Sequence, residues 1–174
     1  LEMGISKLRA AGMAGSDGEH RRVHGLTLAL ILANLSERYL HLARLKDASA
    51  CLEEARSCLD QIQIRDAHWA EADWMYRRAL SYILISCGRR DEAIPLVQGL
   101  LEEVRDRRVS LYPYESPDWW LPAAYIDLGW MHIYQGRYEE ARRMATEAYA
   151  VSVALGHDLG HGFSLDLLAR ARLH

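Results

Sequence analysis

Apolar residues recur three and four positions apart along most of the chain, which predicts amphipathic α-helices and no β-strands. In the stretch 22–44, for example, Leu28, Leu32, Leu35 and Tyr39 share one helical face. Glycines between residues 12 and 18 predict a flexible linker. We therefore expect an N-terminal segment and linker over residues 1–21, followed by one helical domain over residues 22–174. The predicted helices of that domain span about residues 22–44, 46–63, 67–87, 91–107, 117–135, 138–155 and 159–173.

A repeat runs through this helical pattern. Leu35, Leu80 and Leu128 are each followed by a small residue, and an alanine comes thirteen residues after each leucine. The residue before each alanine is acidic. Repeated units of this kind bury their apolar faces against their neighbours. The small residues, including Gly129 and Ala141, predict places where two helices approach closely.

At these residues the chain resembles the tetratricopeptide repeat family. The segment Leu128 to Ala141 carries the Leu-Gly, Gly and Glu-Ala pattern of that repeat, and Ala148 follows it. The alanines lie 45 and 48 positions apart (48 to 93, then 93 to 141), whereas the standard repeat has about 34 residues. This longer spacing resembles the long-helix repeats of MalT-like transcriptional regulators. The resemblance implies an all-α, tetratricopeptide-like helical-repeat solenoid of about three helix–turn–helix units with additional terminal helices.

The resemblance also implies a concave groove that holds a peptide or a partner subunit. Counted from the aligned leucines, the groove-facing side chains would come from the first helix of each unit. They mix aromatic and charged groups, which are common among residues that dominate binding energy. The expected groove residues are Asn34, Glu37, His41, Arg78, Tyr82, Asp127, Trp130 and Tyr134. For Trp130 and Tyr82, packing inside the array is the alternative.

A second candidate surface lies around the connection before the fifth predicted helix. Its aromatic residues are Tyr112, Tyr114, Trp119 and Trp120. Consecutive helical residues point about 100° apart, so Trp119 and Trp120 cannot both face one core. The alternative is that this connection folds back and shields the edge of the array.

Composition excludes several other functions. A net charge of −3 and a pI near 6.3 argue against a nucleic-acid surface. The longest apolar stretch, residues 26–35, is too short to cross a membrane, and no signal segment opens the chain. Three cysteines do not form a disulfide framework, so we expect small buried thiols and a cytoplasmic location.

No catalytic residue, cofactor or metal site is predicted. His157 and His161 have the spacing of two metal ligands on a helix, as do His20 and His24, but neither pair has a third ligand in its pattern. We expect these histidines to cap helices or to lie on the surface. The chain is therefore expected not to be an enzyme.

Two functions remain open at this point. One is a protein-interaction module that binds a protein or peptide, and the other is a ligand-sensing part of a larger MalT-like regulator. The last predicted helix bears on self-association through its apolar residues Phe163, Leu167 and Leu168. If these residues are covered, the helix is a terminal cap; if they are exposed, the array continues or pairs with itself there.

Overall fold

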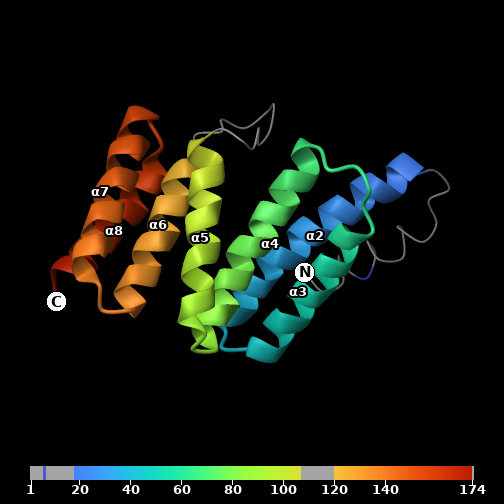
Figure 1. Ribbon diagram of the computed structural model, residues 1–174, viewed down its shortest axis with the longest axis horizontal. Coiled ribbons are helices and arrows are strands. Elements are labelled where there is room, and N and C mark those ends of the chain that lie inside the picture. The colour runs from blue at the N-terminus through green and yellow to red at the C-terminus, as the bar shows by residue number, and fades with distance from the viewer. Residues whose placement is uncertain (1–5, 7–17, 107–119, 174) are drawn as a thin grey trace. The chain divides into compact units, whose positions relative to one another are not determined.

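The protein is described by a computed structural model that covers residues 6, 18–106 and 120–173. Within these residues the fold is entirely helical, and no strand is present (Figure 1). The helices are α2 (Gly18–His41), α3 (Leu45–Asp60), α4 (Ala67–Ser86), α5 (Arg90–Arg105), α6 (Trp120–Tyr134), α7 (Tyr138–Ala154) and α8 (Asp158–Arg172). The prediction of an all-α fold is confirmed.

The chain divides into two compact units, residues 1–86 and 87–174. Helices α2, α3 and α4 belong to the first unit, and α5 to α8 belong to the second. The sequence pattern assigned the third and fourth predicted helices to one repeat unit. In the structure α4 packs with α2 and α3 in the first unit, and α5 packs with α6 in the second.

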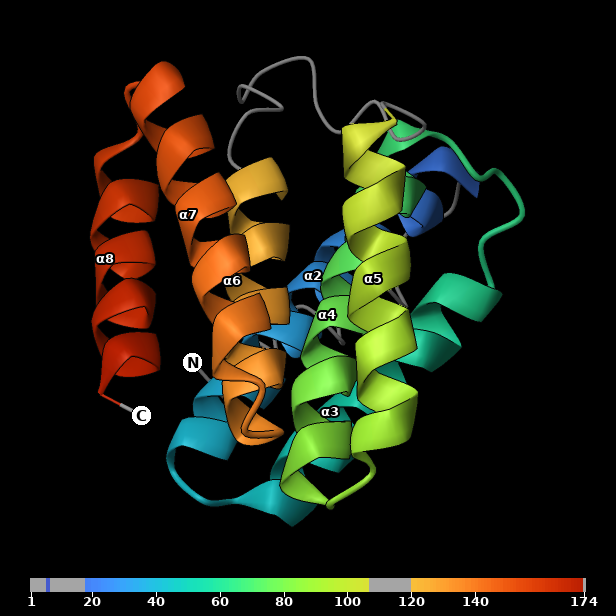
Figure 2. The same cartoon turned by 60° about the vertical axis from the view of Figure 1, so that its left-hand side comes forward.

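In the first unit, α2 lies against both α3 and α4 (Figure 2). The helices meet through alanines with no exposed surface, among them Ala33, Ala48 and Ala55. Larger side chains fill the space around these alanines, and Leu32 and Trp74 are completely buried. Small residues at a crossing let the helix axes approach, while neighbouring large residues maintain dense packing.

In the second unit, α6 contacts each of α5, α7 and α8. Gly129 on α6 explains how α8 can lie so close, because a Cβ atom at this position would collide with the Leu167 side chain. The same Cβ would lie 3.4 Å from the Cβ of Met144 on α7. The prediction that Gly129 marks a close approach is confirmed, and the helices concerned are α7 and α8.

One turn geometry recurs before four of the helices. Ala43, Gly88, Gly136 and Gly156 all adopt a left-handed conformation, with φ values of 56°, 76°, 72° and 65°. Each is followed by the N-cap residue of the next helix, which is Arg44, Arg89, Arg137 or His157. Glycine adopts this conformation without a steric penalty, so Ala43 is the exception in the set.

In each repeat, the acidic residue that precedes the repeated alanine lies in the first turn of the helix after the left-handed residue. The Arg44 guanidinium lies 2.7 Å from the Asp47 carboxylate, and Arg89 lies 2.6 Å from Glu92. The hydrogen bond from Arg89 lowers the pKa of Glu92. The acid also lies near the positive end of the helix dipole, which favours a negative charge. Two of the three repeated acids thus stabilise the start of a helix together with the preceding arginine.

The prediction that the cysteines are buried is wrong. Cys51 and Cys58 are partly exposed, and Cys87 is exposed. Cys87 was expected to be buried at the end of an apolar face. It lies one residue beyond the end of α4 and directly before Gly88, where the chain turns at the surface.

Candidate partner-binding surfaces

The first unit brings Glu37 of α2 and Arg78 of α4 together. The Arg78 guanidinium donates a hydrogen bond of 2.7 Å to a Glu37 carboxylate oxygen, and each side chain is 20% exposed. The same guanidinium lies 5.6 Å from the centre of the Tyr82 ring, one helical turn further along α4. Three of the residues expected in the groove therefore form one cluster that crosses from α2 to α4.

Asn34 and His41, the other two residues of this unit that were expected in the groove, do not belong to that cluster. Asn34 is exposed, and its side-chain amide donates to the Leu30 carbonyl one turn earlier in α2. His41 is exposed and is the last residue of α2. Both lie on α2 together with Glu37, so this helix presents polar groups of different kinds along its exposed side.

In the second unit, Trp130 and Tyr134 form an aromatic pair on α6. Their ring centres lie 6.3 Å apart, and Tyr134 is 44% exposed. The Arg170 guanidinium of α8 lies 5.2 Å from the centre of the Trp130 ring, which is within the range of a cation–π interaction. The sequence pattern did not predict Arg170, because its contact with Trp130 depends on the packing of α8 against α6.

Helix α8 carries further exposed apolar residues on the side from which Arg170 projects. Leu159 and Phe163 are 68% and 52% exposed, and they lie one turn apart. Phe163 lies seven residues before Arg170, so both project from the same side of the helix. We refer to Trp130, Tyr134, Phe163 and Arg170 as the α6–α8 surface.

The apolar face of the last helix is neither fully covered nor fully exposed. Leu167 is completely buried against the rest of the unit, Leu168 is partly exposed and Phe163 is exposed. The helix therefore caps the unit through Leu167 and at the same time leaves other apolar residues at the surface. Neither of the two simple outcomes expected from the sequence describes it.

Two candidate residues are inaccessible. Asp127 is 2% exposed and Trp120 is 8% exposed, so neither side chain faces a partner in this structure. Both residues lie on α6, which contacts α5, α7 and α8. The other candidates around the connection, Tyr112, Tyr114 and Trp119, lie outside the described residues.

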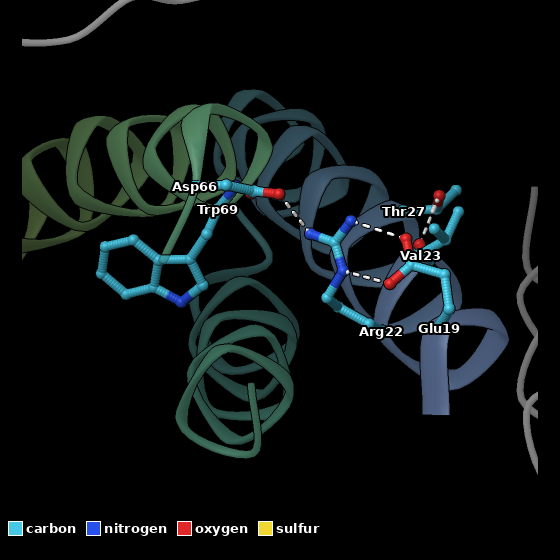
Figure 3. A network of polar contacts seen from close by, with 6 residues as sticks. All are labelled: Glu19, Arg22, Val23, Thr27, Asp66 and Trp69. Carbon is cyan, nitrogen blue, oxygen red and sulfur yellow. Dashed lines mark hydrogen bonds and ion pairs between the residues drawn. The ribbon is translucent and has the colours of Figure 1, made fainter. Parts of the chain in front are cut away.

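A polar network fixes the start of α4 to α2 in the first unit (Figure 3). Arg22 donates to Glu19 one turn earlier and, at 2.6 Å, to Asp66 at the N-terminus of α4. The other oxygen of Asp66 accepts from the Trp69 backbone N–H at 3.1 Å, as expected of an N-cap. Burial raises the pKa of Asp66, but the Trp69 hydrogen bond and the Arg22 charge outweigh this effect, and the net pKa is lowered. The network is a structural clamp, because its charges are paired with one another.

His157 and His161 take structural positions. The Nδ1 atom of His157 accepts a hydrogen bond of 2.9 Å from the Gly160 backbone N–H and thereby caps α8. The His161 ring lies 4.7 Å from the Tyr149 ring, measured between centres. Among the residues that the structure describes, no group of three His, Cys, Asp or Glu side chains is arranged to hold a metal ion.

A hollow of about 1060 Å³ lies between the start of α2 and the end of α3 in the first unit. Its lining includes Arg21, His24 and Leu28 from α2, with Gln61 and Ile62 from the end of α3. The Nε2 atom of His24 is buried without a hydrogen-bond partner among the described residues. The lining thus combines charged and polar side chains with apolar ones.

The comparisons with known proteins agree with the repeat geometry. Residues 123–156 match the family model of the tetratricopeptide repeat. No curated protein and no solved structure matches the chain. In the described part of the chain, no helix is long and apolar enough to span a membrane. The matched residues comprise most of α6, the left-handed turn at Gly136 and all of α7, so this hairpin is a tetratricopeptide repeat, a helical-repeat unit typical of protein-interaction modules.

Proposed function

We propose that this protein binds partner proteins by holding a peptide segment against the α6–α8 surface. The observation that carries the proposal is the aromatic pair of partly exposed Trp130 and exposed Tyr134, with Arg170 over the Trp130 ring. Tryptophan, tyrosine and arginine are the residue types that most often dominate the energy of protein interfaces. Phe163 extends the apolar part of this surface along α8.

The chemistry of the surface defines the peptide that it fits. Apolar side chains of the peptide would pack on Trp130, Tyr134 and Phe163. An acidic group would pair with Arg170, which Asp166 already holds in place at 3.1 Å. The preferred partner is therefore a segment with a bulky apolar residue close to an aspartate or glutamate.

In the first unit, the cluster of Glu37, Arg78 and Tyr82 is proposed as a further contact. Its guanidinium is already paired, so it presents a fixed polar pattern and one aromatic ring. Such an arrangement contributes more to specificity than to affinity, because a partner must match both charges of the pair. Asn34 and His41 are proposed to lie at the margin of this contact.

The test uses a displayed library of random peptides selected on the full chain. Affinities of the selected peptides are then measured for the wild type, for a Trp130→Ala, Tyr134→Ala double variant and for Tyr125→Ala. Tyr125 lies on α6 but on a different side from Trp130, so it is a matched aromatic control. Loss of two interface anchors is expected to weaken binding at least about a hundredfold, which corresponds to about 3 kcal/mol or more in total.

The result can contradict the proposal in two ways. Peptides that bind the double variant as tightly as the wild type would exclude the α6–α8 surface as the site. A library that yields no binder would argue against peptide recognition altogether. Thermal melting of each variant identifies any loss of affinity that comes from unfolding.

A second role, in sensing a small ligand as part of a larger regulator, would use the hollow between α2 and α3. Its volume of about 1060 Å³ lies at the upper end of the range for small-molecule sites. The buried Nε2 atom of His24 would supply a polar contact to the ligand. A ligand that raises the melting temperature of the wild type, and not that of a Leu28→Trp variant that fills the hollow, would support this role.

A further inference from the structure

Five residues of α8 form a single row on the outer side of the second unit. They are Asp158, Gly162, Leu165, Ala169 and Arg172, and all five are exposed. Their spacing of four, three, four and three positions is that of the contact positions of a coiled coil. We call these residues the outer row.

The outer row is distinct from the other two sides of the helix. Leu167 and Ala171 face the unit's core, with exposed fractions of 0% and 2%. Phe163 and Arg170 point toward the α6–α8 surface. The outer row lies on the remaining side, and there a Cβ atom at Gly162 would meet nothing within 4 Å.

The row has the shape that a second helix requires. Leu165 at its centre is 47% exposed, which leaves a large apolar side chain in water. Gly162 and Ala169 on either side have little or no side chain. Small residues that flank a leucine allow two helix axes to come close, so that the leucine packs into the space beside the facing helix.

The charges at the two ends identify the occupant as another copy of the same helix. Asp158 lies at the start of the row and Arg172 at its end. In an antiparallel pair with a two-fold axis at Leu165, Asp158 of each copy faces Arg172 of the other, and Gly162 faces Ala169. A parallel pair would instead place like charges opposite each other at both ends, which is unfavourable.

We propose that two copies of this protein associate through an antiparallel pairing of their outer rows. Leu165 packs against its own counterpart, and the Asp158–Arg172 pairs close both ends of the contact. Helix α8 has 15 residues and is therefore about 22 Å long, so one helix pair buries less area than a standard interface. We expect a reversible dimer with a dissociation constant in the micromolar range, independent of peptide binding.

Analytical ultracentrifugation of the full chain, from about 5 to 500 µM, tests the proposal. We expect a monomer–dimer equilibrium. Leu165→Glu places two like charges at the two-fold axis and should raise the dissociation constant at least about tenfold. Phe163→Ser, on the other exposed side of α8, is the matched control and should leave the constant within about twofold.

Charge reversal tests the antiparallel orientation. Asp158→Arg and Arg172→Asp should each weaken the dimer, and the two changes together should restore it to within about threefold of the wild type. Each reversal also opposes the helix dipole, so the melting temperature of every variant is measured at a concentration where it is monomeric. A wild type that stays monomeric at about 500 µM, or a dimer unaffected by Leu165→Glu, would overturn the proposal. Failure of the double reversal to restore association would exclude the antiparallel arrangement.

Discussion

The Arg22 guanidinium and the Asp66 carboxylate lie 2.6 Å apart and connect the start of α2 to the start of α4. Residues 22 and 66 are far apart in sequence, and the same carboxylate also caps α4. One side chain therefore serves both a local function and a tertiary one.

Replacement of Asp66 separates these two functions. Asp66→Ala removes both the cap and the charge and should lower the free energy of unfolding by about 1–2 kcal/mol. Asp66→Asn keeps an oxygen that can accept from the Trp69 N–H, so its effect should be about half as large or less. Urea unfolding followed by circular dichroism measures both values. Equal losses in the two variants would mean that the cap contributes nothing.

Gly129 is predicted to be intolerant of any side chain. A Cβ atom there collides with Leu167, so Gly129→Ala should cost about 1–3 kcal/mol, although alanine is the better helix former. Gly99, inside α5, is the matched control, because a Cβ atom at Gly99 meets nothing within 4 Å. Gly99→Ala should stabilise the protein by about 0.5–1 kcal/mol. The two substitutions are expected to shift the melting temperature in opposite directions. A stabilising Gly129→Ala would contradict the packing of α8 on α6.

Replacement of Ala43 by glycine should stabilise the protein. It has a φ of 56°, which costs an alanine about 1 kcal/mol or more relative to glycine. Ala43→Gly should therefore raise the stability by about 0.5–1 kcal/mol. The reverse change at the equivalent turn, Gly88→Ala, should lower it by a similar amount. Chemical denaturation of both variants checks the pair, and a destabilising Ala43→Gly would rule out the left-handed turn.

The burial of His132 predicts that the free energy of unfolding depends on pH. The residue is 4% exposed, and burial, assisted by the Arg137 charge, lowers the pKa of its imidazole. The unfolded chain therefore binds the proton more readily. The stability that the neutral ring contributes is complete above about pH 6.5 and is lost as the pH falls toward the lower pKa of the folded state.

His132→Phe should remove this part of the dependence while preserving the side-chain volume. The Nδ1 atom of His132 has no hydrogen-bond partner among the described residues, so the change to phenylalanine should remove no hydrogen bond at that atom. Unfolding free energies at about pH 7.5 and pH 5.5 provide the comparison, with exposed His41→Gln as the control. An unchanged slope in His132→Phe would show that other groups produce the effect.

Local signals in the sequence account for several of the helix ends. Aspartate favours the N-cap and glycine favours the turn after a helix, and Asp66, Gly88, Gly136 and Gly156 take these positions. These features depend on a residue and its immediate neighbours, so their physical cause is contained in the local sequence. The left-handed Ala43 could not be predicted in this way, because alanine does not favour that conformation.

The candidate surfaces were less predictable because they depend on contacts between helices. Position in the repeat proposed Glu37 and Arg78 as groove residues, and the structure brings their side chains together because α2 and α4 pack side by side. It could not show that Asp127 is buried or that Arg170 lies over Trp130. Both facts depend on how α6 packs against other helices, and the geometry of such contacts is not encoded in a periodic pattern.

The constant turn geometry at Ala43, Gly88 and Gly136 accounts for the irregular length of the repeats. The repeated alanine follows each of these residues by five positions in every repeat. The alanines themselves, in contrast, are 45 and 48 positions apart (48 to 93, then 93 to 141). Variation in length is thus confined to the residues outside the turn and the helix start that follows it. Natural variants of such a chain can gain or lose residues in those segments without altering how the two helices of a hairpin meet.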